Sequence, residues 1–425
     1  MKQYDIIVIG AGPAGLFTAI QIGRHKKVAI LEKNSECGQK LLMTGAGKCN
    51  ITQAGKMEKF LDCYGKNARF VRHSLTQFTN SDLLEFFKKR GLDFTTMDNG
   101  KVFPKTMKAS DVLDILIKEC ATLNIPIHTN TAVTNIEKMD AGFKLTTNQG
   151  LFQAQKVIVA TGGLSYPQTG STGDGHIWAK ALGHKIVPTK PALTSLKIKN
   201  YQLADLSGQS FANATYTHWR DGKKIGTYSD RNLLLTHTGL SGPAIFIPSR
   251  YMTSGDVLKL NFLGNNVEET RQKLITDLTN GGKILVKTVV RNLDITKSFA
   301  DKILELAAIP ADLKCAELKK AQRTTLINLL LEYEMEIKSL GGYHIAQVTA
   351  GGVCTKEINP KTMASRKILD LYFIGEVIDV DGDTGGYNLQ IAFSTAYICA
   401  HAIKDSHAVK DSRAIKNQAK EENHE

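Results

Sequence analysis

The sequence predicts an α/β protein whose parallel sheet is assembled from both ends of the chain around a long insertion. Three observations predict this fold class. Residues 4–33 read as a buried strand, a glycine turn, a helix and a second buried strand. Residues 368–403 return to buried strand, glycine loop and helix. Between 191 and 341, alternating β runs are followed by helical periodicity, which indicates an inserted unit.

The opening unit carries the glycine spacing of a dinucleotide-binding turn. The hexapeptide GAGPAG runs from Gly10 to Gly15 between the first strand and the helix. Gly10 permits the tight turn, Gly12 lets a pyrophosphate approach the main chain, and Gly15 lets the helix pack on the strand. Glu32 ends the second strand, where its carboxylate can accept hydrogen bonds from ribose hydroxyls. Together these features favour a Rossmann-like nucleotide site over a plain βαβ turn.

The rest of the first half reads as helices followed by an antiparallel meander. Residues 81–92 and 109–124 each begin with a capping residue and continue with apolar residues three and four apart, which predicts two amphipathic helices. From residue 131 the pattern changes to short alternating runs separated by turn residues. We therefore expect a β-meander that leads into a buried strand ending near Gly163.

Two further glycine segments favour FAD over a nicotinamide cofactor. The strand at 157–163 ends in Ala-Thr-Gly, and the segment 371–386 ends a strand with Gly-Glu before a glycine-opened helix. FAD needs such a contact from the far end of the chain, because its ribityl chain and ring extend across the sheet toward another helix N-terminus. Only one full dinucleotide fingerprint is present, so NADPH or NADH would act as a transient electron donor without its own domain.

Composition narrows the class of protein. The 425 residues are 42% hydrophobic, enough for more than one core, and the net charge is +13. The seven cysteines form no CxxC pair, so we expect no metal site and a reducing, cytoplasmic location. The sequence predicts neither a signal peptide nor a membrane helix. Lysine-rich clusters at 88–90, 101–108 and 220–224 either contact phosphates or form solvated faces.

Several longer motifs resemble one family of bacterial flavoproteins. They include GQKLLMTGAGKCNIT, ATGGLSYPQTGSTGDGHIWAKALGH, LTHTGLSGPAI and YFIGEVIDVDGDTGGYNLQIAFSTA, and they extend through most of the chain. The chain resembles the NAD(P)/FAD-dependent, aminoacetone-oxidase-like family, which includes a bile-acid enone reductase and a ribosomal RNA uridine reductase. At residues 45–50 that family usually has the sequence Gly-Gly-Gly-Arg-Cys-Asn, and this chain differs from it at Ala46 and Lys48. A lysine cannot form the two parallel hydrogen bonds that an arginine makes to a phosphate or carboxylate.

The resemblance implies a three-part architecture. An FAD-binding domain would comprise residues 1–190 and 346–405. A β-barrel-like insert would comprise 191–267 and 325–345, with a small helical domain at 268–324. The polar tail, 406–425, is predicted to be disordered.

The motifs and the resemblance together also imply a set of cofactor contacts. The glycine-containing segment from Lys40 to Asn50 would lie along the FAD. Residues 386–389 would form the start of the last helix, near the flavin ring. The predicted cofactor residues are Gly10, Gly12, Pro13, Ala14, Gly15, Glu32, Lys33, Lys40, Leu41, Gly45, Gly47, Asn50, Ile51, Val133, Ala160, Thr161, Gly162, Gly375, Glu376, Asp383, Gly386, Tyr387, Asn388 and Leu389.

Reduction of a polarised C=C bond also needs a proton donor, for which the sequence offers two candidates. Cys49 and His237 are those candidates, although a packing role for the cysteine and a structural role for the histidine are the simpler readings. Asp174 is expected to cap the helix that follows it. Lys101 and Lys105 could contact an anionic substrate or remain solvated.

Four functions are compatible with these features. The first is an FAD-dependent oxidoreductase that performs two-electron chemistry on a small molecule, with reduction of a polarised C=C bond as its expected reaction. The second is a flavin-dependent dihydrouridine synthase acting on ribosomal RNA, favoured by the basic composition. The third is an amine or aminoketone oxidase. The fourth, from a different class, is a non-catalytic FAD- or RNA-binding protein. The sequence does not specify an oligomeric state.

Overall fold

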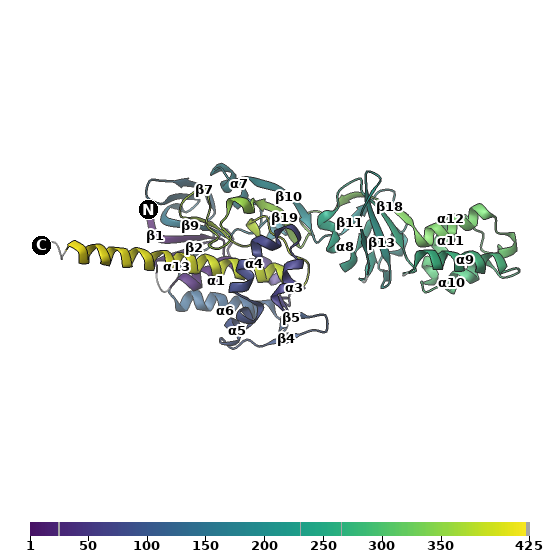
Figure 1. Cartoon of the computed structure of the whole chain (residues 1–425), viewed down its shortest axis with the longest axis horizontal. Coiled ribbons are helices and arrows are strands. Elements are labelled where there is room, and N and C mark those ends of the chain that lie inside the picture. The colour runs from purple at the N-terminus through teal and green to yellow at the C-terminus, as the bar shows by residue number, and fades with distance from the viewer. Residues whose placement is uncertain (24–25, 230, 265, 422–425) are drawn as a thin grey trace. The chain divides into compact units, whose positions relative to one another are not determined.

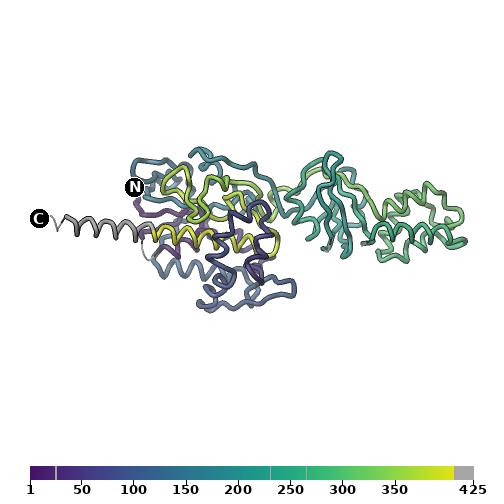
Figure 2. The backbone as a smooth tube through the Cα atoms, in the orientation of Figure 1, coloured from purple at the N-terminus to yellow at the C-terminus, as the bar shows by residue number. Residues whose placement is uncertain are grey.

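The computed structural model divides the chain into two compact units. It describes all residues except 24–25, 230, 265 and 422–425, with side chains up to Asp405. Unit 1 comprises Met1–Lys190 and Gln347–Glu425, and unit 2 comprises Pro191–Ala346. Figure 2 traces this course, in which both ends of the chain enter unit 1. The predicted disordered tail at 406–425 lies outside the described side chains and stays a prediction.

Unit 1 contains the predicted parallel sheet with an antiparallel extension, so the fold class is confirmed. In the described residues the strand order is β6-β2-β1-β9-β8-β7, and β20 also pairs with β9. The strands are β1 (Lys2–Ile9), β2 (Val28–Leu31), β6 (Ile127–His128), β7 (Val133–Lys138), β8 (Phe143–Thr147), β9 (Gly150–Val159) and β20 (Leu371–Phe373). β1 lies between two parallel partners, with Ile7 opposite Ala29 in β2 and Val157 in β9. All of β2 and the second half of β1, Ile6–Ile9, are apolar and buried, as are the last residues of β9, Val157–Val159, which is expected for a sheet covered on both faces there.

Strand β9 joins the meander to the parallel sheet. Its first half pairs antiparallel with β8, and its second half pairs parallel with β20 through Val157 and Leu371. The last run of the predicted meander and the buried strand predicted after it form one continuous ten-residue strand, whose first part alternates between exposed and buried residues and whose last four residues are buried. The C-terminal segment of the chain is thereby hydrogen-bonded to the middle of the sheet.

Helices cover the sheet, and the N-terminal ends of several of them line a cavity that is described below. Those of unit 1 are α1 (Pro13–Ile22), α2 (Gln39–Met43), α3 (Met57–Asp62), α4 (Ala68–Gln77), α5 (Asn80–Lys88), α6 (Ala109–Thr122), α7 (Asp174–Ala181) and α13 (Tyr387–Glu421). α1 and α13 run side by side in Figure 1, and the Thr18 hydroxyl donates to the Ala396 carbonyl at 2.8 Å. Two small sheets complete the unit. They pair β3 (Thr52–Gln53) and β4 (Phe94–Thr96) with β5 (Lys101–Pro104), and β10 (Ile186–Ala192) with β19 (Val348–Val353).

Unit 2 combines an antiparallel sheet with a group of helices. The described strand order is β12-β15-β16-β11-β18-β17-β13-β14. The strands are β11 (Leu196–Ile198), β12 (Ser210–Phe211), β13 (Thr215–Arg220), β14 (Lys223–Tyr228), β15 (Leu233–Leu235), β16 (Gly239–Ser241), β17 (Val257–Asn261) and β18 (Tyr333–Leu340). The helices are α8 (Pro243–Phe246), α9 (Val267–Asn280), α10 (Val286–Arg291), α11 (Lys297–Leu306) and α12 (Lys320–Leu331).

The sheet and helices of unit 2 share one hydrophobic core. The rings of Phe211 and Phe262, from the β part, lie 4.8 Å and 4.6 Å from the ring of Phe299 on α11. Leu326 and Leu330 of α12 are buried in the same cluster. The β part and the helical part therefore stabilise one another as a single packed body.

No described helix combines the length and the apolar character that crossing a bilayer requires.

Candidate functional site

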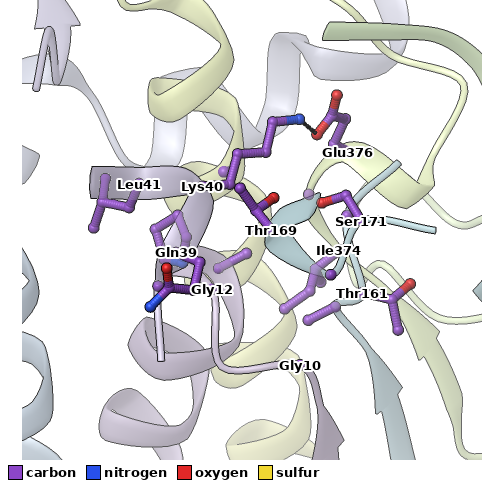
Figure 3. Close-up of a pocket in the computed structure, with 18 of the residues that line it drawn as sticks. Gly10, Gly12, Gln39, Lys40, Leu41, Thr161, Thr169, Ser171, Ile374 and Glu376 are labelled. Carbon is purple, nitrogen blue, oxygen red and sulfur yellow. Dashed lines mark hydrogen bonds and ion pairs between the residues drawn. The ribbon is translucent and has the colours of Figure 1, made fainter. Parts of the chain in front are cut away.

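A long cavity in unit 1 begins where β1 and β9 end. It holds about 1280 Å³ of space, including the part open to solvent, and Figure 3 shows its lining. Residues from both ends of the chain form its walls. The predicted cofactor residues that line it are Gly10, Gly12, Pro13, Ala14, Glu32, Lys33, Lys40, Leu41, Val133, Ala160, Thr161, Gly162, Gly375, Glu376, Asn388 and Leu389.

The three glycines of the first turn meet different surroundings. A methyl group at Gly10, where φ is +106°, would lie 2.6 Å from the Ala160 carbonyl oxygen, and one at Gly15 would lie 1.9 Å from the Gly10 carbonyl oxygen. Both positions therefore require glycine for packing. A methyl group at Gly12 would meet no protein atom within 4 Å, because this residue faces the cavity at the start of α1. Protein packing thus leaves the backbone of Gly12 open to a ligand.

Glu32 is fixed by the main chain at the edge of the cavity. Its carboxylate accepts from the backbone N–H of Ala11 at 2.7 Å and of Asn34 at 2.9 Å. The adjacent Lys33 forms an ion pair with Asp174, with 2.6 Å between its Nζ and Oδ2. Asp174 follows the N-cap residue Gly173 and makes no cap hydrogen bond, so the predicted capping role is wrong.

An ion pair between Lys40 and Glu376 connects the two ends of the chain inside the cavity. Lys40 Nζ lies 2.6 Å from Glu376 Oε2, as the dashed line in Figure 3 shows. The other carboxylate oxygen accepts from the Ser165 hydroxyl and the Thr349 N–H, both at 2.9 Å. Burial alone raises the pKa of Glu376, but the charge and hydrogen bond of Lys40 and these further donors outweigh it and lower the pKa. Glu376 is therefore an anion held on the cavity wall.

A second chamber adjoins the long cavity. It shares Lys40, Thr44, Gln347, Val348, Asn388 and Leu389 with the long cavity, so the two spaces have a common wall. Its other lining residues are Met43, Gly45, Ala46, Asn50, Lys101, Phe103, Tyr166, Thr384, Gly385 and Gly386. This lining mixes cationic, hydroxyl and amide groups with two aromatic rings, which suits a planar polar ligand better than a wholly apolar one.

Asparagines hold the glycine loop at the start of α13. Asn388 accepts from Gly382 N–H at 2.8 Å and donates to the Gly382 carbonyl at 3.0 Å. With its amide assigned to satisfy its neighbours, Asn50 accepts from Gly386 N–H at 3.1 Å and donates to the carbonyls of Thr52 and Val102. Asn50 therefore positions the chamber wall through the main chain, and its predicted contact with the cofactor stays a prediction.

The cavity fits a dinucleotide on two independent observations. The backbone at Gly12 faces open space at the N-terminus of α1, where N–H groups and the helix dipole favour an anion such as a pyrophosphate. The Thr161 hydroxyl lines the same cavity and is buried without a hydrogen-bond partner among the described residues. Buried hydroxyls are normally paired, so a polar ligand group at this place would satisfy it.

Cys49 does not reach either cavity. The residue is completely buried, adopts a left-handed φ of +60°, and its N–H donates to the Thr44 carbonyl at 2.9 Å. Burial raises the pKa of its thiol to about 12, while a hydrogen bond with Thr44 acts in the opposite direction. A thiol without access to the chamber cannot deliver a proton there, so we assign Cys49 a packing role and withdraw it as a proton donor.

The second predicted donor, His237, belongs to unit 2 and is not among the residues that line either cavity. His237 is exposed in the turn between β15 and β16 of unit 2, where the neighbouring Thr236 bonds to Gly239. The lining of both cavities comes from unit 1. Lys105 is likewise outside, paired at 3.3 Å with Asp93 in an exposed position. Lys101 is the predicted substrate contact that the structure does bring into the second chamber.

Some predicted cofactor residues do not line either cavity and instead pack against neighbouring segments. Tyr387 packs its ring 5.0 Å from that of Phe60, and Ile51 is fully buried. The Gly47 carbonyl accepts from Ala109 at the start of α6, in a run of three positive φ values from Gly45 to Gly47. The predicted residues that line neither cavity are Gly15, Gly47, Ile51, Asp383 and Tyr387.

Sequence reasoning missed several lining residues that lie in loops. Tyr166, Gln347 and Thr384 line the second chamber, and Ser165 supports Glu376. Tyr166 has φ +54° and ψ +61°, directly before Pro167, a conformation that costs an L-residue about 1–2 kcal/mol. The Tyr-Pro dipeptide was the sequence feature that could have pointed to Tyr166, because the backbone conformation of a residue before proline is restricted. Within the described residues, no group of His, Cys, Asp and Glu is arranged to bind a metal ion.

Comparisons with known proteins agree with this geometry. The family described as "HI0933-like protein Rossmann domain" matches residues 4–402. The ribosomal RNA dihydrouridine synthase of Escherichia coli (strain K12) is 32% identical over 94% of this chain and 98% of its own length. The 3-dehydro-bile acid delta(4,6)-reductase of Clostridium scindens is 32% identical over 93% of this chain and 98% of its own length.

A solved structure shows the same fold. The open form of a flavocytochrome c3 fumarate reductase has a TM-score of 0.50 and 16% identity, covering 94% of this chain and 78% of that one. At this identity the likeness concerns the fold alone. The family match and the two relatives confirm the family resemblance that the sequence motifs predicted.

Proposed function

Because this chain belongs to the HI0933-like family of Rossmann-domain proteins, we propose that it is an FAD-dependent oxidoreductase that reduces a polarised carbon–carbon double bond. One observation carries the proposal. A long cavity, built from the first glycine turn and the start of the last helix, shares a wall with a second, polar chamber. The first space suits a dinucleotide and the second a substrate beside it.

The residues of the long cavity have separate roles in this proposal. Gly12 and the N-terminus of α1 would bind the pyrophosphate, and Glu32 would accept from the ribose. Thr161 would donate to, or accept from, a polar group of the cofactor. Lys40 and Glu376 would hold the two ends of the chain together where the long cavity meets the second chamber.

FAD, when bound, would supply two-electron hydride chemistry. The protein would exclude water, orient the substrate and provide a proton. The glycine loop before Tyr387 turns the N-terminal end of α13 toward the shared wall, where Asn388 and Leu389 line both spaces. A helix N-terminus there would stabilise negative charge that develops during the reaction. NADPH or NADH is the proposed source of electrons and would visit the site transiently.

The names of the two relatives support reduction of a double bond. One is named for a product, dihydrouridine, in which the C5=C6 bond of uridine is saturated. The other is named as a delta(4,6)-reductase of a bile acid. Both reactions add two electrons and two protons to a bond conjugated with a carbonyl group. The two relatives are equally similar to this chain, so reaction type is better supported than substrate.

A uridine in ribosomal RNA is the substrate that we favour. The chain has a net charge of +13, and Lys48, Lys101 and Lys108 lie on or next to segments that line the second chamber. Such a rim would attract phosphates. Phe103 and Tyr166 offer aromatic faces on which a base could stack after leaving its helix. A bile acid would need a larger apolar lining than this chamber has.

The reaction class can be tested with purified protein. The protein should be yellow, and NADPH or NADH should bleach it anaerobically. The reduced protein is then mixed with a uridine-containing ribosomal RNA fragment or with a 3-oxo-Δ4 steroid, and return of the colour is followed. Colour recovery with either compound supports double-bond reduction. A colourless protein that stays colourless with added FAD would contradict the proposal, as would bleaching by aminoacetone with peroxide release in air.

The RNA substrate has its own test. Deleting the gene should remove one dihydrouridine from ribosomal RNA, detected by nucleoside mass spectrometry, and the plasmid-borne gene should restore it. Binding of the purified protein to the RNA fragment should weaken steeply as salt rises, because phosphate contacts release counterions. An unchanged nucleoside profile would exclude this substrate and leave the reductase proposal standing.

A further inference from the structure

We propose that Tyr166 is the catalytic proton donor of the second chamber and that Lys101 stabilises the charge that forms during the proton transfer. This inference rests on the proposed function, because a donor is needed only if a double bond is reduced. It replaces Cys49 and His237, neither of which is among the residues that line the chamber. Tyr166 and Lys101 both line that chamber.

Elimination among the chamber's proton-bearing groups leads to these two residues. Lys40 is held by Glu376, and the Thr44 hydroxyl donates to the Leu41 carbonyl at 2.6 Å. The amides of Asn50 and Asn388 are bonded to main chain. The chamber's remaining amide and hydroxyl, on Gln347 and Thr384, are too weakly acidic to donate a proton. Neither the Tyr166 hydroxyl nor the Lys101 ammonium has a hydrogen-bond or ion-pair partner in the part of the chain that the structure describes.

The backbone around Tyr166 is held in place although it is strained. Tyr166 adopts a left-handed conformation directly before Pro167. Its carbonyl accepts from the N–H and the hydroxyl of Thr169, at 2.8 Å and 2.7 Å. The preceding Ser165 is anchored twice, through its N–H to Thr349 and through its hydroxyl to Glu376. A bulky residue that the fold keeps in such a conformation is a candidate for function.

The chemistry balances with these two groups. A two-electron reductant of the reduced-flavin class supplies a hydride to the β carbon of the conjugated bond. The π electrons move toward the carbonyl oxygen, where the Lys101 ammonium stabilises the negative charge. The O–H bond of Tyr166 breaks and a C–H bond forms at the α carbon. The resulting phenolate, also stabilised by Lys101, regains a proton from water.

The test separates the two halves of the reaction. In Tyr166→Phe, anaerobic bleaching by NADPH should stay within about twofold of wild type, because no proton transfer to substrate is involved. Reoxidation by the compound that wild type accepts should fall by about 100- to 10,000-fold, the usual contribution of a general acid. The affinity for that compound, measured from the shift of flavin absorbance on binding to the oxidised protein, should change little. Tyr251→Phe, at an exposed tyrosine of unit 2, is the matched control.

Lys101→Met should show a different pattern. We expect both weaker binding in the absorbance titration and slower reoxidation, because the ammonium contacts the substrate oxygen before and during the reaction. Lys105→Met removes a neighbouring lysine that lies outside both cavities and is the control. Wild-type binding and reoxidation in Lys101→Met would overturn the role given to Lys101.

Two outcomes decide the role of Tyr166. Wild-type reoxidation in Tyr166→Phe would overturn the proposal. If that variant does not retain flavin, Tyr166→Gly, which relieves the positive φ, is assayed with added phenol. Restored reoxidation would support the proposal and its absence would overturn it. Failure of wild type itself to reoxidise with either compound would instead contradict the proposed function, so the two failures are distinguishable.

Discussion

Two carboxylate networks, that of Glu376 in unit 1 and that of Asp256 in unit 2, differ in what surrounds them. In unit 1, Glu376 pairs with Lys40 on the wall of a cavity, and its side chain is 20% exposed. In unit 2, Asp256 pairs with Arg220 at 2.8 Å and with His218 at 2.7 Å, and its side chain is 1% exposed. Similar chemistry is therefore used once beside open space and once inside a closed core.

This difference separates a functional ion pair from a structural one. Asp256 also accepts from the Thr253 N–H at 2.9 Å, so protein groups fully occupy it. Its network joins strand β13 to the segment before β17, which stabilises the sheet. The Lys40–Glu376 pair lies where two spaces meet, and Thr161, which lines the same cavity, has no hydrogen-bond partner among the described residues. His218 Nδ1, in the network of Asp256, is also buried without a hydrogen-bond partner among the described residues, so an unsatisfied group alone does not mark a site. A carboxylate network is evidence of a site only when empty volume also adjoins it.

Two glycine substitutions should give the largest contrast between the units. A methyl group at Gly239 of unit 2 would lie 2.3 Å from the Leu196 carbonyl oxygen, so Gly239→Ala should destabilise the protein by about 4 kcal/mol or more. Gly12→Val should leave the melting temperature of the flavin-free protein unchanged but reduce bound flavin at least tenfold, because its side chain would enter the cavity. Denaturant unfolding and flavin absorbance measure these effects. A lower melting temperature of the flavin-free Gly12→Val variant would show that Gly12 is required for protein packing and would contradict this account.

Removing the buried charge of unit 2 should be the next largest effect. Asp256→Asn should cost about 3 kcal/mol of unfolding free energy, because it leaves Arg220 and His218 without their anion. Burial alone raises the pKa of Asp256, but the bonds from Arg220 and His218 outweigh it and lower the pKa. The stabilisation is therefore complete above the unfolded pKa of about 3.9 and is lost as pH falls through the lower folded pKa. The variant should show a shallower loss of stability below about pH 4. An equally steep acid transition would contradict this account.

Lys40→Met should have a smaller effect on stability and a distinct effect on the cavity. We expect a loss of about 1–2 kcal/mol, since Glu376 retains the donors Ser165 and Thr349 and some access to water. Flavin affinity should fall as well, whereas Asp256→Asn should not change it in the folded protein. Equilibrium dialysis of FAD compares the two variants. Equal flavin affinity in Lys40→Met and wild type would make this pair structural, like that of unit 2.

The smallest expected effect concerns the exposed loop beside the second chamber. Ala46 has φ +55° between two glycines that also have positive φ. Ala46→Gly removes the strain of a left-handed alanine but increases the entropy of the unfolded chain, so we expect a net gain of about 0.5 kcal/mol. Ala54→Gly, at a residue without positive φ, should instead lose about that amount. A lower free energy of unfolding in both variants would show that the backbone of Ala46 is not strained.

The sequence predicted the parts of the site that local patterns determine. Gly10, Gly12 and Glu32 follow from the spacing of one βαβ unit, because strand and helix geometry alone bring them together. The parallel sheet followed in the same way from buried runs. The motif resemblance extended the list to Lys40 and Glu376 as residues of one cavity.

Contacts between distant segments could not be predicted in this way. Lys40 and Glu376 are 336 positions apart, and only the folded sheet shows that they form a pair. Cys49 was a reasonable donor as a residue type, yet tight packing beside the glycines removes it from the chamber. His237 lies in a motif that the family shares but on an exposed turn of unit 2. Tyr166 was missed because its orientation depends on Ser165 and Thr349, which the sequence does not place together.

The pairing of the first and last segments also has a consequence for synthesis on the ribosome. Chains grow at about 5–20 residues per second, so roughly 20 to 70 seconds separate the appearance of Lys40 from that of its partner. Throughout that interval α1 lacks the helix that covers it, while all of unit 2 emerges and has the residues of its own core. Nascent chains halted before residue 371 should therefore carry a folded insertion beside an apolar surface that attracts chaperones.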